Sequence, residues 1–203
     1  MTVAAGTWPA LERRLEGQLV AMEPLAPEHE ADLFAAGSDE RVWRWIDEYV
    51  AVSRERFHDW MTEALEVSAA GVECALATVD LASGRAIGSS RYLAPSEPDL
   101  KVEIGWTWLT PAAWRGGANV EAKLLMLTHA FEELGCRRVE FKTDARNERS
   151  RGALAALPAQ FEGIFRKHRI VRGVGQRDSA FYSVIDDEWP VVKANLERRL
   201  SHA

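Results

Sequence analysis

A loop with two adjacent glycines stands directly before a predicted helix, and its residue types point to anion binding. The loop reads Trp114-Arg115-Gly116-Gly117-Ala118-Asn119-Val120. Neighbouring glycines let a backbone come close to a ligand. The unpaired N–H groups and the dipole of a helix N-terminus favour an anion at that point. We therefore expect a phosphate or a pyrophosphate here, with a plain tight turn as the alternative interpretation.

The loop matches neither of the two common nucleotide-binding patterns. It has no Gly-Lys-Ser/Thr ending, because Lys123 comes six residues after Gly117. It also lacks the Gly-x-Gly-x-x-Gly spacing of dinucleotide-binding proteins. ATP and dinucleotides are therefore disfavoured as ligands.

The elements that must position this loop follow from the hydrophobic pattern. Alternation of apolar and polar residues predicts strands, and apolar residues at helical spacing predict helices. The expected strands are 18–25, 74–80, 86–93, 101–109, 138–143, 161–170 and 178–185. The expected helices are 27–37, a turn after 38–40, 52–68, 118–134, 147–157 and a last helix from about 187. This order predicts an α/β sheet with a crossover helix after the fourth strand.

Several segments around the loop share their sequence with one family. They are Glu103-Ile104-Gly105-Trp106, Asn-x-Glu-Ala-Lys at 119–123, Asp144-Ala145-Arg146-Asn147-Glu148-Arg149-Ser150, Phe161-Glu162-Gly163, and Tyr182-Ser183-Val184-Ile185 with Glu188-Trp189-Pro190. Together with the loop, these segments resemble the GNAT acyltransferases, specifically their RimJ/RimL-type branch. Within the loop, Gly117 fits the family pattern, whereas Trp114 and Asn119 depart from it. The resemblance runs from about residue 18 to residue 200, with most of its specificity in the second half.

The resemblance implies a fold as well as an activity. It implies a mixed α/β protein with a single GNAT-like domain, whose central, mostly antiparallel sheet is flanked by helices. The sheet would splay apart between strands four and five, at 101–109 and 138–143. We expect residues 1–17 to form an N-terminal arm and residues 18–203 to form the acyltransferase domain.

The resemblance also implies a site for acyl-CoA in the opening between those two strands. The backbone of the fourth strand would pair with the pantetheine arm, as an added strand pairs with a sheet edge. The loop would hold the pyrophosphate, and Asn147 would fix the arm from the other side. The expected CoA-binding residues are Trp106, Thr107, Trp108, Leu109, Arg115, Gly116, Gly117, Ala118, Asn119, Val120 and Asn147.

Acyl transfer to an amine needs a base, because a free primary amine has a pKa of about 10 and must lose a proton before it attacks. Glu103 matches the family's usual base position, and a solvent-facing strand residue is the alternative interpretation. The thiolate leaving group needs an acid. The tyrosine that many members use is Leu154 here, so the resemblance implies Ser150, which otherwise would only cap a helical turn. A second glutamate used by some members falls on Arg169.

The first half of the chain is expected to build the acceptor pocket. The segment from Asp39 to Tyr49 places two indoles and a tyrosine among four acidic residues. Such a wall would receive a cationic amine by charge and cation–π contact, and simple packing is the alternative. The predicted acceptor-binding residues are Trp43, Trp45, Asp47, Glu48 and His168.

Composition excludes several other classes. The chain has 203 residues with ordinary apolar and charged fractions, so we expect one globular domain. Its net charge of −6 disfavours a nucleic-acid-binding surface. Two cysteines without metal-ligand spacing predict neither a disulfide framework nor a metal site. No secretory signal or membrane-spanning stretch is visible, which favours the cytoplasm.

We therefore predict a cytoplasmic acyl-CoA-dependent N-acyltransferase that uses acetyl-CoA, or another acyl-CoA, without a metal. The acceptor is expected to be a small cationic amine or a protein N-terminal amine, attacking directly in a ternary complex. A homodimer is compatible with the sequence. The alternatives are a non-catalytic acyl-CoA-binding or sensing module with the same fold, and an interaction protein without a ligand.

Overall fold

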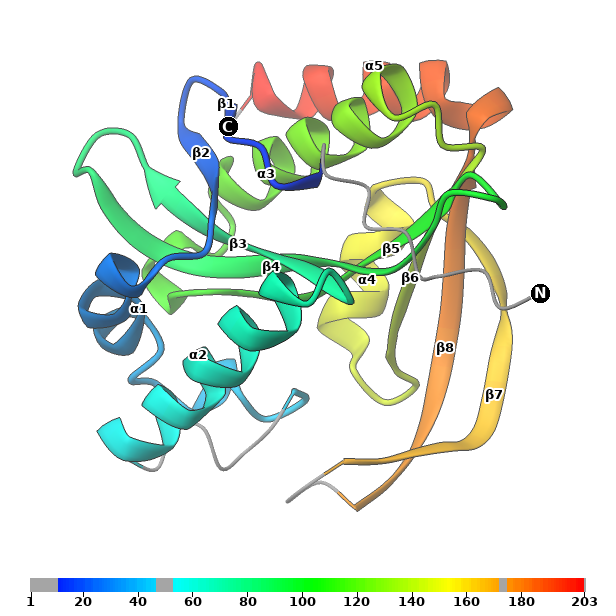
Figure 1. Cartoon of the computed structure of the whole chain (residues 1–203). Helices are drawn as coiled ribbons and strands as arrows, with labels where there is room; N and C mark the ends of the chain where they lie inside the picture. The colour runs from blue at the N-terminus through cyan, green and yellow to red at the C-terminus, as the bar shows by residue number, and fades with distance from the viewer. Residues whose placement is uncertain (1–10, 47–52, 172–174, 203) are drawn as a thin grey trace.

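The computed structural model describes residues 11–46, 53–171 and 175–202. In this part of the chain, eight strands form one sheet in the order β1-β2-β3-β4-β5-β6-β8-β7 (Figure 1). Neighbouring strands are antiparallel except for β5 and β6. The strands are β1 Leu15–Glu16, β2 Val20–Pro24, β3 Glu73–Asp80, β4 Arg85–Ser96, β5 Lys101–Leu109, β6 Arg138–Asp144, β7 Gln160–Val171 and β8 Gly175–Ile185. The predicted mixed α/β architecture is confirmed.

Helices cover both faces of this sheet. They are α1 Glu30–Ala36, α2 Arg54–Ala69, α3 Ala118–Thr128, α4 Glu148–Ala156 and α5 Trp189–Leu200. Figure 1 shows α3 and α5 together on one side of the sheet, and α1 and α2 on the other. Strand β3 shows the consequence of this layering, since Cys74 and Leu76 join the core under α3 while Ala75 and Ala77 join the core under α2. No helix of the described residues is long and apolar enough to cross a membrane.

The sheet opens between β5 and β6, as predicted. Parallel pairing of these strands covers only Lys101–Glu103 with Arg138–Glu140. Beyond Glu103, β5 stays paired with β4 while β6 stays paired with β8, so the two halves of the sheet separate. From Ile104 onward, one edge of β5 therefore has no strand partner within the described residues.

Three predicted elements differ in extent from the sequence expectation. The expected arm 1–17 is described only from Leu11, and there Leu11 and Leu15 are buried in the core. The turn after 38–40 is a single 3-10 turn, Glu40–Val42. The helix expected over 118–134 is α3 followed by a π-helical turn, His129–Glu133. The apolar pattern continues through that turn, so periodicity alone did not show the change of helix type.

Most of the described tryptophans help to build the core. Trp43, Trp60 and Trp108 lie with ring centroids 4.9 to 6.0 Å apart in the core under α1 and α2. Trp189 stacks on Phe131 on the opposite face of the sheet. The burial of large aromatic rings contributes strongly to core stability.

Candidate functional site

A β-bulge in β5 lies at the opening of the sheet. Gly105 faces Arg91 on β4 and Trp108 faces Ser89, so β5 has one residue more than its partner over this stretch. Trp106 takes up the extra length with a φ of +49°, a left-handed conformation that is uncommon outside glycine. Bulges of this kind are frequent beside active sites because they re-aim the local backbone.

The loop before α3 leaves the first turn of that helix open. Gly117 is the N-cap of α3, and no side chain caps the helix. A Cβ built at Gly116 would have no neighbour closer than the Ala113 carbonyl oxygen at 3.7 Å, so packing does not require a glycine there. Arg115 is exposed and has a φ of +68°. The geometry fits the prediction that backbone N–H groups here receive an anion.

Trp114 in this loop is held by three contacts. Its Nε1 donates to the Leu109 carbonyl oxygen at 2.9 Å. The Arg149 guanidinium carbon lies 3.9 Å from the ring centroid, and that of Arg41 lies at 5.4 Å. Burial lowers the pKa of Arg149, and the charge of Arg41 adds to this effect. The Leu109 carbonyl, at the end of the stretch predicted to pair with pantetheine, is thus already engaged.

The two tryptophans predicted to line an acceptor pocket, Trp43 and Trp45, lie in other surroundings than expected. Trp43 is fully buried, and its Nε1 donates to the Gly37 carbonyl oxygen at 2.7 Å, so it packs in the core and lines no open pocket. Trp45 already carries two guanidinium groups, with the Arg44 and Arg146 carbons 5.2 and 5.4 Å from its ring centroid. Contrary to the prediction of a cation–π contact with the acceptor amine, the ring of Trp45 is therefore already in contact with two cations of the chain itself.

Asp47 and Glu48, the acidic part of that predicted wall, lie outside the described residues. Their assignment to the acceptor pocket therefore stays a prediction.

Glu103 lies next to the bulge and is 5% exposed, which excludes the interpretation as a solvent-facing residue. Its Oε2 accepts a hydrogen bond from Lys142 Nζ at 2.7 Å, whereas its buried Oε1 has no hydrogen-bond partner in the described residues. A Cβ built at Gly105 would lie 3.1 Å from that Oε1, so the free oxygen faces the backbone of the bulge. Burial raises the pKa of Glu103, and Lys142 opposes the rise.

Asn147 and Ser150 begin α4 on the far side of the opening. The Ser150 amide donates to Asn147 Oδ1 at 3.1 Å, so Asn147 is the side-chain cap of this helix. Capping uses the Asn147 oxygen and fixes Ser150 in the first turn. Leu154, where many relatives were expected to carry a tyrosine, is buried in the core.

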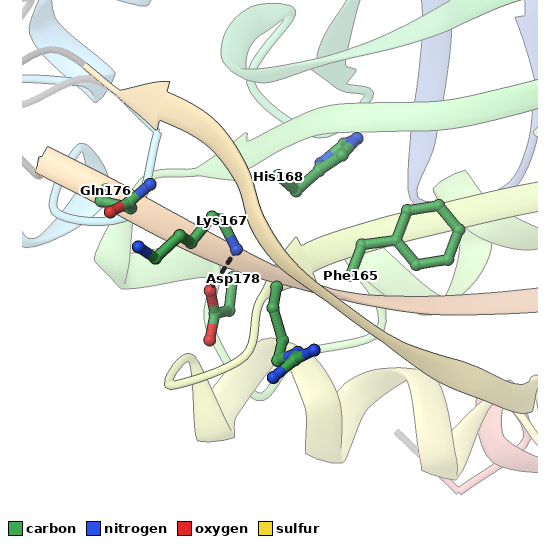
Figure 2. A pocket seen from close by; sticks show the side chains of 6 residues that line it. Phe165, Lys167, His168, Gln176 and Asp178 are labelled. Atoms are coloured by element: carbon green, nitrogen blue, oxygen red, sulfur yellow. Dashed lines mark hydrogen bonds between the residues drawn. The ribbon is translucent and has the colours of Figure 1, made fainter.

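His168 lies on β7, outside the core. Its Nδ1 is 3.0 Å from Ser179 Oγ, and its ring meets those of Phe165 and Phe181 edge-on. Partial burial lowers the pKa of His168, and the charges of Lys142 and two arginines add to this effect. A groove of about 760 Å³ beside it is lined by Phe165, Arg166, Lys167, His168, Gln176 and Asp178. Figure 2 shows these side chains and the hydrogen bond from the Lys167 amide to Asp178.

Side-chain contacts across β8 and β6 place His168 and Glu103 on the same face of the sheet. Phe181 on β8, which His168 contacts, faces Lys142 on β6, and Lys142 binds Glu103. Alternate residues of a strand share a face. The structure thus places on one face two residues that were predicted from the sequence to have separate roles.

Two lysines near the opening, Lys142 and Lys123, were not predicted as site residues from the sequence. Alternation in the strand 138–143 placed Lys142 on a polar face, but nothing local showed that it reaches Glu103, 39 positions away. Lys123 is 8% exposed, and its Nζ donates to Thr107 Oγ1 at 2.7 Å and Ser90 Oγ at 3.1 Å. It thereby holds the side chain that follows the bulge. Burial lowers the pKa of Lys123 to about 7.

The buried amine of Lys123 predicts a pH-dependent stability. Its ordinary pKa is 10.5, so between about pH 7 and pH 10.5 the unfolded chain binds more protons than the folded chain. The free energy of unfolding should therefore rise with pH in this window, by about 1 kcal/mol per pH unit. Urea unfolding of the wild type and Lys123→Met between pH 7 and about 8.5, below the usual thiol titration, should show this rise only in the wild type. Parallel curves for the two proteins would contradict the assignment.

No group of three or more His, Cys, Asp or Glu side chains in the described ranges could hold a metal ion. Cys74 and Cys136 are both buried, and burial raises the pKa of each thiol to about 12. The reactive form of cysteine is the thiolate, so neither thiol is suited to act as a nucleophile.

Comparisons with known proteins agree on one family. A family model described as an acetyltransferase (GNAT) domain matches residues 20–159. A GCN5-related N-acetyltransferase from Brucella melitensis is 33% identical with a TM-score of 0.85, over 92% of this chain and 85% of that chain. A structure from T. thermophilus, described as an acetyltransferase, is 39% identical with a TM-score of 0.84, over 93% and 97% of the two chains.

A more distant structure shares the fold. Mycobacterium smegmatis RimJ, solved in complex with CoA-disulfide, is 17% identical with a TM-score of 0.78, over 94% of this chain and 96% of that chain. None of the curated proteins compared with this chain matches it.

Proposed function

Because this chain belongs to the GNAT acetyltransferase family, we propose that it transfers an acetyl group from acetyl-CoA to a primary amine in a direct step. The observation that carries this proposal is the free, buried Oε1 of Glu103 beside the bulge at the open edge of β5. A carboxylate with a raised pKa and one unused oxygen is suited to accept a proton.

The residues at the opening fit acyl-CoA as a substrate. The open edge of β5 offers backbone groups to an extended amide chain. The uncapped first turn of α3 offers N–H groups and a helix dipole to the pyrophosphate. The positively charged Arg115 stands in the same loop, exposed to solvent.

Two side chains at the opening, Glu103 and Ser150, would carry the proton transfers of this reaction. The neutral amine attacks the thioester carbonyl, whose developing negative charge is stabilised by a backbone N–H at the bulge. Glu103 takes the proton that the attacking nitrogen loses, directly or through water. The carbon–sulfur bond then breaks, and Ser150 gives a proton to the leaving thiolate while a solvent water returns a proton to the serine oxygen. No covalent enzyme intermediate is formed.

An acceptor screen tests this proposal. Acetyl-, propionyl- and succinyl-CoA are each incubated with a panel of small amines and short peptides, with thiol release and product mass as the readouts. We expect thiol release with acetyl-CoA and an acetylated amine. Thermal stabilisation by CoA without any acylated product would favour the binding module, and no stabilisation at all would favour an interaction protein.

The helix N-terminus gives a second, more local prediction. Ala118→Pro removes the N–H of the first residue of α3, a helix position where proline is common. Gly117 before it lies in the α region, which a following proline disfavours, so thermal unfolding must first show that the variant is folded. Ala118→Ser keeps that N–H and serves as the matched control. Loss of one charge-assisted hydrogen bond should weaken CoA binding by about tenfold in the proline variant. Isothermal titration calorimetry measures this difference, and equal affinities of the two variants would show that this N–H binds no phosphate.

A further inference from the structure

Two arginines face each other across the β7–β8 hairpin. Arg169 and Arg177 are direct partners in the antiparallel register. Like charges in this position repel one another and destabilise a sheet unless something compensates them. In the sequence, Arg169 stands where the family resemblance leads one to expect a glutamate.

Arg177 is buried without a partner for its Nε. It is 9% exposed, and this nitrogen has no hydrogen-bond partner within the described residues. Among the residues that the structure describes, neither Arg169 nor Arg177 forms an ion pair. Burial lowers the pKa of Arg177; the charge of Asp144 opposes this effect, and that of Arg169 adds to it. A buried guanidinium without a bonding partner is costly to the fold unless a ligand supplies the missing acceptor.

The other charges on this face are already paired. Lys142 binds Glu103 at 2.7 Å, and Arg146 binds Asp144 at 2.8 Å. Within each of these two pairs the positive and the negative charge cancel. The two facing guanidinium groups therefore leave a local surplus of positive charge. This surplus contrasts with the net charge of −6 of the whole chain.

The arginine pair lies on the same face as Glu103. Arg177, Ser179 and Phe181 alternate along β8, and Phe181 faces Lys142, the partner of Glu103. The charge of Glu103 also acts on Arg177. An acceptor that presents its amine to Glu103 can therefore extend toward the arginines.

We propose that Arg169 and Arg177 bind an anionic group, a carboxylate or a phosphate, on the same small molecule that carries the acceptor amine. The planar fork of a guanidinium matches the oxygens of both anions. The surrounding cations also lower the pKa of the bound amine, which raises its neutral, reactive fraction. This inference rests on the proposed function and narrows its acceptor to a zwitterionic or anionic amine, in place of the small cationic amine or protein N-terminal amine expected from sequence.

Matched pairs of acceptors test this inference. Aminoalkyl carboxylates of two to six carbons are compared with their amides, and aminoalkyl phosphates with the corresponding amino alcohols. We expect kcat/KM for at least one anionic member to exceed that of its neutral partner by more than about tenfold. The two series show whether a carboxylate or a phosphate is preferred.

Variants connect that preference to the arginines. Arg177→Gln and Arg169→Gln should each reduce the ratio of anionic to neutral kcat/KM by about tenfold. Arg198→Gln, which removes an exposed charge from α5 outside the hairpin, should leave the ratio within about twofold. Thermal unfolding and CoA affinity check that each variant is folded. Equal rates with anionic and neutral amines, or a ratio insensitive to Arg177, would overturn the inference while leaving the proposed function intact.

If no amine is acetylated, the proposed function is refuted. A binding measurement then tests the anion site independently of catalysis. N-acetylated aminoalkyl carboxylates and their amides are titrated into the protein saturated with CoA, and heat is recorded. Tighter binding of the carboxylates to the wild type than to Arg177→Gln supports the anion site. Equal binding to the two proteins refutes it.

Discussion

Replacing Glu103 by glutamine is expected to lower kcat by at least about 100-fold, because an amide of the same shape cannot accept the proton of the attacking amine. The affinity for CoA should change by less than about twofold, since Glu103 belongs to neither the loop nor the edge proposed to bind it. Steady-state thiol release at saturating acetyl-CoA measures the first quantity, and calorimetry measures the second.

Glu140→Gln is the matched control for this experiment. Glu140 faces Glu103 across the parallel pairing of β5 and β6, but its carboxylate already binds Arg138 at 2.8 Å. We expect this variant to keep kcat within about threefold of wild type, as for a carboxylate outside the reaction. A wild-type rate in Glu103→Gln would remove Glu103 from the role of base.

The pH dependence of turnover tests the same role through Lys142. Turnover should fall as the pH falls through the raised pKa of Glu103, because the protonated carboxyl cannot act as a base. Lys142 holds that pKa down by a hydrogen bond and by its charge. In Lys142→Met the pKa of Glu103 should therefore rise further, and the acidic limb of the kcat profile should move to higher pH. A limb that stays in place would show that another group controls it.

The largest effect on stability is expected from Glu121, in the first turn of α3. Its carboxylate accepts the backbone N–H groups of Gln18, Leu19 and Val20 at 2.9, 2.7 and 2.7 Å. Glu121→Ala leaves all three donors unpaired at a partly buried site. Since each buried unpaired donor costs about 1–3 kcal/mol, we expect a loss of about 3–5 kcal/mol in the free energy of unfolding. Urea denaturation measures it.

Two further variants show whether this loss comes from the hydrogen bonds. Gly17→Ala keeps Glu121 but would place a methyl group on its carboxylate, so it should also destabilise the fold by displacing that group. Glu197→Ala removes an exposed carboxylate from α5 and should change the free energy of unfolding by less than about 0.5 kcal/mol. Equal effects of Glu121→Ala and Glu197→Ala would contradict the account.

The contact of Glu121 with β2 also connects stability to the proposed function. It fixes the first turn of α3 against the sheet, and the same turn presents the N–H groups proposed to bind pyrophosphate. We therefore expect the Glu121→Ala protein, at temperatures where it remains folded, to bind CoA less tightly than wild type.

The sequence by itself determined the order of the helices and of the strands from β2 onward, the glycine loop before α3 and the opening between β5 and β6, whereas β1 lies in the segment expected to be an arm. These features depend on residues that are close in the chain, on alternation along a strand, or on motifs shared with a family.

Only the tertiary structure decided which side chains meet on those faces. One extra residue at Trp106 breaks the regular alternation of β5, so the two-residue spacing of Trp106 and Trp108 did not reveal that both rings pack at the core under α1 and α2. Contacts such as Lys142 with Glu103, or Arg169 with Arg177, join residues on different strands. Their formation depends on strand register, and the hydrophobic pattern of one segment carries no information about its partner's register. The local surplus of positive charge at Arg169 and Arg177, on a chain of net negative charge, follows from that register.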